Sequence, residues 1–103
     1  MAAHVLALYN APLDPTHFEQ YYFGTHVPLA KRLPGLLSYT VNKGALVAPD
    51  GAPPYYFVAV LEFASMAAIQ SALASPEGQV TVADVPNFAT GGASLIMYQT
   101  QTM

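Results

Sequence analysis

The sequence predicts an α+β fold, in which a four-stranded antiparallel sheet carries helices on one face. Two observations lead to this prediction. Strand and helix patterns follow one another in the order strand, helix, strand, strand, helix, strand, and turn-forming Gly, Pro, Asp and Asn residues separate them. At 103 residues the chain is long enough for one modest hydrophobic core. We therefore expect a single domain over residues 1–103.

The first half of the chain predicts a strand and then a broken helix. Residues 4–10 form a short apolar run that turn-forming residues close. Asp14 and Pro15 are a strong helix start, because the carboxylate can accept from first-turn amides and a proline at the first helical position loses no hydrogen bond. Pro28 removes a later helical hydrogen bond. We expect the main helix to end near residue 25, with a kink or a second short turn reaching residue 32.

The second half predicts three strands and a helix that a proline interrupts. Tyr39 and Val41 share one face of the first of these strands. Ser65 can cap the helix, and the segment 76–78 breaks it. The expected ranges are 36–47, 55–63 and 93–99 for the strands, 66–73 and 79–85 for helical segments, and 48–54 for a proline-rich loop.

This order allows two β-α-β halves to interleave in a ferredoxin-like βαββαβ sandwich, with both helices on one face of the sheet. The opposite face is apolar, and charged residues make up only 9% of the chain, compared with about 25% in an ordinary soluble domain. So few charged side chains cannot make that apolar face stable in contact with water. We therefore expect an obligate homodimer in which two sheets pack face to face.

Charge and composition exclude several classes of partner. The net charge is −3, and Lys31, Arg32 and Lys43 are too few basic side chains for a patch that follows nucleic-acid phosphates. No run of about 18 apolar residues is present to span a membrane, and the N-terminus lacks the basic start of a secretory signal. The chain has no cysteine, and its three histidines lack the short spacing of a metal site. We expect a cytoplasmic protein without a metal, nucleic acid or membrane.

Two motifs resemble one known family. The first is Phe18-x-x-Tyr21-Tyr22-x-x-x-His26-x-Pro28-Leu29, followed by Leu33-Pro34-Gly35-Leu36 and Tyr39. The second is Asp84-Val85-Pro86-Asn87-Phe88. Together and in this order they resemble the EthD family, named from ethyl tert-butyl ether degradation, and the resemblance covers nearly the whole chain.

The resemblance implies a dimeric α/β barrel, in which ferredoxin-like protomers pair their sheets. This wider group includes cofactor-free monooxygenases of aromatic polyketides, polyketide cyclases, small isomerases and haem-binding enzymes, so the fold does not define one reaction. Ser38, Tyr39 and Thr40 stand on the strand where many family members have basic residues. An anionic ligand would therefore have fewer positively charged partners on this strand.

His26 is the best candidate for acid–base chemistry, because imidazole takes or gives a proton near neutral pH. Tyr22 lies four residues earlier, so the two side chains share a helical face and a phenol–imidazole hydrogen bond is possible. Such a pair suits proton abstraction next to a carbonyl, with Tyr22 donating to the developing enolate oxygen. The alternative is that His26 caps the last turn of its helix and binds a carbonyl that Pro28 leaves free.

Five further residues are candidates for binding a substrate: Asn10, His4, Asp84, Phe88 and Tyr98. His4 and Asn10 share strand parity, and they could line the pocket if their face looks toward the helices. Asp84 could orient an imidazole, or serve only as a turn and cap residue. Tyr98 could contribute a hydroxyl from the last strand, although a tyrosine at a sheet edge is more often a packing residue.

The leading hypothesis is a small cofactor-independent enzyme that acts on a hydrophobic aromatic or polyketide-like molecule by general acid–base chemistry. Cyclase, isomerase, decarboxylase and monooxygenase reactions are all open. One alternative is a non-catalytic accessory protein that stores or delivers a hydrophobic ligand. The other is a haem-binding protein with His26 as the axial ligand.

Overall fold

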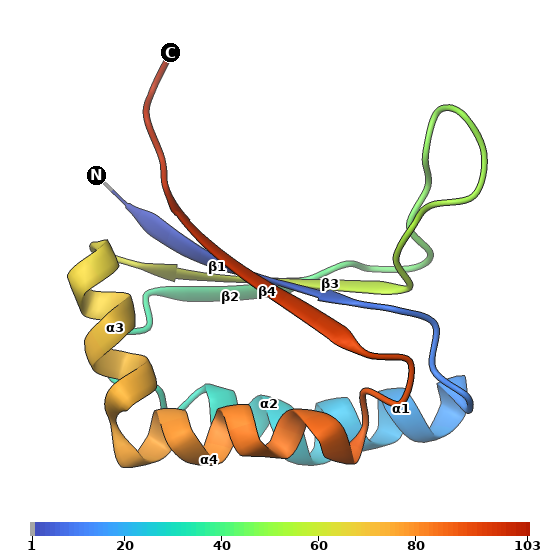
Figure 1. Ribbon diagram of the computed structural model, residues 1–103, viewed down its shortest axis with the longest axis horizontal. Coiled ribbons are helices and arrows are strands. Elements are labelled where there is room, and N and C mark those ends of the chain that lie inside the picture. Colours follow the sequence, from blue (N-terminus) through green and yellow to red (C-terminus); the bar gives the residue numbers. More distant parts are fainter. Residues whose placement is uncertain (1) are drawn as a thin grey trace.

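The computed structural model describes residues 2–103 and confirms the predicted fold. Its four strands form one sheet in the order β2-β3-β1-β4, and each neighbouring pair is antiparallel. They are β1 (Ala3–Tyr9), β2 (Ser38–Val41), β3 (Phe57–Phe63) and β4 (Ala93–Gln99). The helices lie together on one side of the sheet, and the other side is uncovered (Figure 1). This is the ferredoxin-like arrangement.

The helical layer has two parts. The first consists of α1 (Pro15–Tyr21), the π-helical turn η1 (Tyr22–His26) and α2 (Val27–Ala30); the second consists of α3 (Met66–Ala74), α4 (Pro76–Asp84) and the 3-10 turn η2 (Val85–Asn87). Asp14 caps α1 as predicted, since its Oδ1 atom accepts from the N–H of His17 at 3.2 Å. Ser75 ends α3 and also caps α4, because its Oγ atom accepts from the N–H of Gly78 at 3.0 Å. Pro76 therefore begins a helix, whereas the sequence had predicted only a break there.

The irregularity predicted before Pro28 takes the form of the π-helical turn η1. The backbone N–H of Val27 donates to the carbonyl of Tyr22, five residues earlier, and the chain continues directly into α2. Pro28 is tolerated because it lies at the start of α2, where its missing N–H is least needed. The wider turn leaves both Tyr22 and His26 buried, at the two ends of the same five-residue segment.

Strand β2 is shorter than the predicted range 36–47, because Asn42 closes its ladder. The Asn42 side-chain oxygen accepts from the N–H of Val58 at 2.9 Å, and the Asn42 N–H donates to the Val58 carbonyl at 3.2 Å. The side chain thus takes the donor that a continuing strand would use. The chain then leaves the sheet in a long loop, residues 43–56, which rises on the uncovered side (Figure 1).

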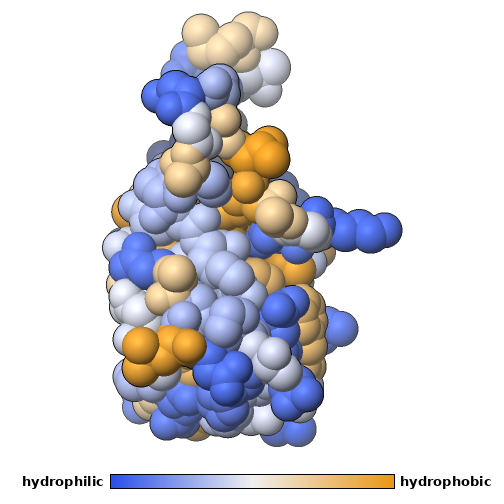
Figure 2. All heavy atoms as spheres, turned by 90° about the vertical axis from the view of Figure 1, so that its right-hand side faces the viewer, coloured by the Kyte–Doolittle hydropathy of each residue, from blue (hydrophilic) through white to orange (hydrophobic). Residues whose placement is uncertain are grey.

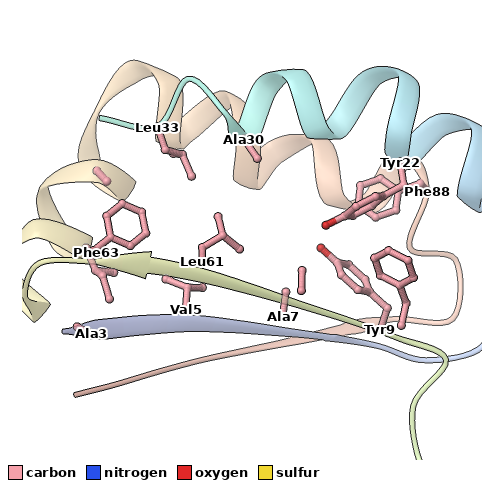
Figure 3. Packing of buried hydrophobic residues seen from close by; sticks show 14 of the residues in the cluster. Ala3, Val5, Ala7, Tyr9, Tyr22, Ala30, Leu33, Leu61, Phe63 and Phe88 are labelled. Atoms are coloured by element: carbon pink, nitrogen blue, oxygen red, sulfur yellow. The ribbon is translucent and has the colours of Figure 1, made fainter. Parts of the chain in front are cut away.

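The two central strands supply the core on one face and an apolar surface on the other. Residues such as Val5 and Leu61 point toward the helices and belong to the same buried cluster as Tyr22 (Figure 3). The intervening residues point to the uncovered side, where Val60 pairs with Leu6 and Leu6 pairs with Ile96. This apolar row is only partly shielded within one protomer.

The close approach of α3 and α4 depends on Gly78. A Cβ atom at this position would lie 2.1 Å from the carbonyl oxygen of Ala72 and 2.6 Å from the Cα atom of Leu73. Both are backbone atoms, so the helices would have to shift to relieve the overlap. We predict that Gly78→Ala lowers the free energy of unfolding by about 1–3 kcal/mol, as measured by urea denaturation.

Gly24→Ala is the matched control, because a Cβ atom at position 24 meets nothing within 4 Å. In this helical segment we expect alanine to leave the free energy of unfolding unchanged or to raise it by up to about 1 kcal/mol. Equal losses for the two substitutions would contradict the explanation by backbone overlap.

Candidate functional site

An apolar cavity of about 50 Å³ lies between the helical layer and the sheet. Side chains from all four strands and from both halves of the helical layer line it, and most of them are aliphatic. The lining residues that carry polar atoms are Tyr9, Tyr22, His26, Tyr39 and Thr81. The hydroxyls of Tyr9 and Tyr22 point toward one another across the layer between β1 and η1 (Figure 3).

A larger groove of about 670 Å³ lies on the outside, between α1, Phe23 and the 43–56 loop. Its ionisable side chains include Glu19 and Lys43, but the groove is open to solvent and contains no buried acid–base pair. Figure 2, which views the molecule from the loop side, shows hydrophilic and hydrophobic groups interspersed on this surface. We therefore place the candidate site at the inner cavity.

His26 and Asp84 form a buried pair beside the cavity. Nδ1 of His26 lies 2.9 Å from Oδ2 of Asp84, and the two side chains are 5% and 8% exposed. The other carboxylate oxygen, Oδ1, accepts from the Tyr21 hydroxyl at 2.6 Å and from Nδ2 of Asn87 at 3.0 Å. Asp84 thus binds three side chains, and they come from α1, η1 and η2.

These contacts determine the charge states of the pair. Burial would raise the pKa of the Asp84 carboxyl, but the hydrogen bonds from Tyr21, Asn87 and His26 together hold that pKa below its usual value. Burial also lowers the pKa of His26 below 6.5, and the Asp84 carboxylate only partly opposes this shift. At neutral pH the aspartate is therefore ionised and the imidazole is neutral.

The predicted hydrogen bond between Tyr22 and His26 is absent. Their rings are in contact, with centroids 5.2 Å apart, but the Tyr22 hydroxyl bonds to the hydroxyl of Tyr39 at 2.6 Å. The four-residue spacing brings the two rings together, and the phenol oxygen then reaches past the imidazole to the sheet. The alternative role of His26, as a cap that binds a backbone carbonyl, is not observed either: its Nδ1 atom bonds to Asp84, and among residues 2–103 no hydrogen bond joins its side chain to a carbonyl.

Phe88 packs directly against the imidazole. Its ring centroid lies 4.6 Å from that of His26, and its side chain is fully buried. Phe88 is not among the residues that line the cavity, so the structure places it behind His26 as a support. Of the predicted site residues, His26, Tyr22, Asp84 and Phe88 are therefore brought together.

His4, Tyr98 and Asn10 lie away from the cavity, which corrects three predicted positions. His4 and Tyr98 are paired across β1 and β4 on the uncovered face, where their rings stack at 5.4 Å. As expected, the residues of β1 alternate between the two faces of the sheet. The face toward the helices, however, carries Val5 and Ala7 and not His4. Asn10 follows β1 and is exposed, and its side chain donates to the carbonyl of Gly91 at 3.0 Å, so it holds a turn.

Five polar residues of the site were not predicted as site residues: Tyr9, Tyr21, Tyr39, Thr81 and Asn87. Strand parity placed Tyr39 on one face with Val41, and the family motifs contain Tyr21 and Asn87. Asn87 is only three residues from Asp84, so its spacing could have indicated this contact, whereas Tyr21 is 63 residues from Asp84 and Tyr39 is 17 residues from Tyr22, which local spacing does not reveal. Among residues 2–103 no group of three or more His, Asp and Glu side chains is arranged to hold a metal ion. Over the same residues, no helix is long and apolar enough to cross a membrane.

Comparison with known proteins gives matches along nearly the entire chain. The sequence profile of the EthD domain matches residues 10–92. An uncharacterized 11.0 kDa protein from the thcB-thcC intergenic region of Rhodococcus erythropolis is 40% identical over 100 residues, which are 96% of this chain and 95% of that protein. The crystal structure of an EthD family protein from Bacillus halodurans C-125 has a TM-score of 0.89 at 28% identity, and the match covers 98% of this chain and 100% of that one.

Two more distant structures share the fold. SnoaB, a cofactor-independent oxygenase from Streptomyces nogalater, has a TM-score of 0.65 at 16% identity and matches over 99% of this chain and 94% of its own. A dimeric ferredoxin-like protein from Thermobifida fusca YX has a TM-score of 0.70 at 16% identity, over 97% of this chain and 92% of its own. The profile match and the 40% identical relative together establish the relationship: this chain belongs to the EthD family.

Proposed function

We propose that this protein is a cofactor-independent enzyme that moves a proton on a small hydrophobic molecule, with His26 as the general base. The observation that carries the proposal is the buried His26–Asp84 pair beside an apolar cavity. Burying a carboxylate costs free energy unless it is well paired, and a protein that only stored an apolar ligand would not need one. The pair therefore favours catalysis over storage.

The hydrogen bond of Asp84 determines which imidazole nitrogen acts. An ionised carboxylate only accepts, so Nδ1 of His26 carries the proton and Nε2 keeps its lone pair. Nε2 can then take a proton from a substrate in the cavity, and Asp84 stabilises the imidazolium that forms. General acid–base catalysis of this kind contributes about 10²–10⁴-fold in rate.

The distant relatives are compatible with this chemistry. SnoaB, which has the same fold, is a cofactor-independent oxygenase. At that level of identity the likeness concerns the fold alone, and one fold hosts many reactions. The site geometry in this chain therefore carries the proposal, and the reaction type that we favour is proton abstraction next to a carbonyl.

The size of the cavity constrains the ligand. A volume of about 50 Å³ is well below the 300–1,000 Å³ of a typical drug-sized site. It suits a small molecule, or the reacting end of a larger aromatic or polyketide-like one. A porphyrin does not fit beside His26 in this cavity, so we derive no function from haem.

Catalysis is tested by deuterium exchange. We predict that the protein in D₂O accelerates exchange at the α-carbon of at least one neutral ketone in a panel such as acetone, cyclopentanone and cyclohexanone, followed by NMR. His26→Gln is expected to lower the enzymatic rate about 10²–10⁴-fold. Substituting the exposed histidine, His17→Gln, is the matched control and should leave the rate unchanged.

Exchange no faster than in buffer for every ketone would contradict the proposed catalysis. Saturable ligand binding that is unaffected by His26→Gln, without any exchange, would instead favour the storage hypothesis.

We further propose that the protein is a homodimer formed through the uncovered sheet face. The row formed by Val60, Leu6 and Ile96 lies at the centre of this face and is apolar. The loop 43–56 rises on the same side of the sheet, where it is placed to contact a second copy of the chain (Figure 1). The dimeric protein from Thermobifida fusca supports this proposal by its fold.

The dimer is tested by placing a charge in this apolar row. We predict that Val60→Lys raises the dimer dissociation constant at least about 100-fold, because an unpaired ammonium would be buried between two sheets. Sedimentation velocity over a range of concentrations measures this change. Val80→Lys on α4, a position 53% exposed on the helical side, is the control and should remain dimeric. A monomeric wild-type protein at micromolar concentration would contradict the proposal.

A further inference from the structure

The cavity wall contains very few polar atoms that lack a partner. Thr81 is not one of them, because its hydroxyl donates to the carbonyl of Glu77 at 2.8 Å within α4. Asp84 does not line the cavity, and its two oxygens already accept from three side chains. The polar groups that remain available to a ligand are Nε2 of His26 and the hydroxyls of the three lining tyrosines.

The hydroxyls of the three tyrosines are grouped around that of Tyr22. Its hydroxyl lies 2.6 Å from that of Tyr39, and the hydroxyl of Tyr9 points toward it from β1 (Figure 3). Each hydroxyl has one hydrogen to donate. The bond between Tyr22 and Tyr39 uses one of the three hydrogens, and a bond between Tyr9 and Tyr22 would use a second, so at least one hydrogen remains to be donated to a ligand.

The remaining hydrogen and Nε2 of His26 form a complementary pair of groups. One is a donor and the other an acceptor, and both belong to residues that line the same otherwise apolar cavity. A ligand that satisfies both must have an oxygen that accepts and, close to it, a hydrogen that can be removed as a proton. A carbonyl group with an acidic C–H on the adjacent carbon has both features.

We propose that Tyr9, Tyr22 and Tyr39 form an oxygen-binding subsite that donates a hydrogen bond to the carbonyl of a neutral, enolisable substrate. The inference rests on the proposed function, because it supplies the second half of the same site. When Nε2 of His26 takes the α-proton, the C–H electron pair forms a carbon–carbon double bond and the carbonyl π pair moves to the oxygen. The enolate oxygen then accepts the tyrosyl hydrogen bond more strongly than the carbonyl did. Return of the proton from Nε2 to carbon closes the cycle.

Two properties of the cluster favour a neutral carbonyl over a carboxylate. Burial raises the pKa of both Tyr9 and Tyr22 well above the usual value of 10, so these phenols stay protonated and act as donors. No lysine or arginine is among the residues that line the cavity. A carboxylate ligand would therefore be buried without a counter-ion, which is costly.

The subsite is tested with two probes of similar shape, 4-fluorophenol and fluorobenzene, whose binding is followed by ¹⁹F NMR. The phenol mimics an enol, and fluorobenzene lacks the oxygen. We expect 4-fluorophenol to bind at least about tenfold more tightly, because only its oxygen engages the cluster. Tyr22→Phe should reduce this preference about tenfold and leave the affinity for fluorobenzene unchanged.

Tyr39→Phe, on the edge strand β2, is the second variant and carries the test if Tyr22→Phe does not fold. Tyr55→Phe is the matched control, because Tyr55 lines the outer groove and not the cavity. The inference is overturned if neither probe binds, if the two probes bind equally, or if the preference persists in both cavity variants. A preference that depends on the tyrosines, together with no ketone exchange, would retain the subsite and reject His26 as the base.

Discussion

The buried carboxylate of Asp84 is the constraint on which the rest of the site depends. A carboxylate withdrawn from water must be supplied with hydrogen bonds, and here Tyr21, His26 and Asn87 supply them. These three residues lie on α1, η1 and η2, so one side chain joins the two halves of the helical layer. Satisfying Asp84 therefore fixes the imidazole at the cavity.

The π-helical turn makes this arrangement possible. In a regular helix Pro28 would remove a hydrogen bond in the middle of the segment, whereas here the helix widens just before it and continues as α2. The widened turn leaves Tyr22 and His26 both buried, one bonded toward the sheet and the other toward Asp84. The widened turn just before Pro28 thus carries both Tyr22 of the donor cluster and His26, the proposed base.

Much of the fold could be predicted from local patterns, because caps, prolines and strand alternation act over a few residues. The Asp14 cap and the irregular segment before Pro28 are examples. The side-chain contacts of the site are harder to predict from local patterns. Four-residue spacing correctly places Tyr22 beside His26, but the partner of Nδ1 is 58 residues away, and local spacing cannot select it. Alternation likewise groups His4 with its strand neighbours without indicating which face the helices cover.

The most direct test of this account is to determine which nitrogen of His26 carries the proton, and at what pH the ring becomes charged. Long-range ¹H–¹⁵N correlation spectra of the labelled protein report both, and His26→Gln identifies the signals. The account predicts a neutral ring at pH 7.5 with the proton on Nδ1, and a pKa below 6.5. Since the unfolded chain takes up this proton at higher pH than the folded protein, the free energy of unfolding should also decrease as the pH falls below 6.5. A proton on Nε2 at pH 7.5, or a pKa above 6.5, would contradict the assignment of His26 as a base held by Asp84.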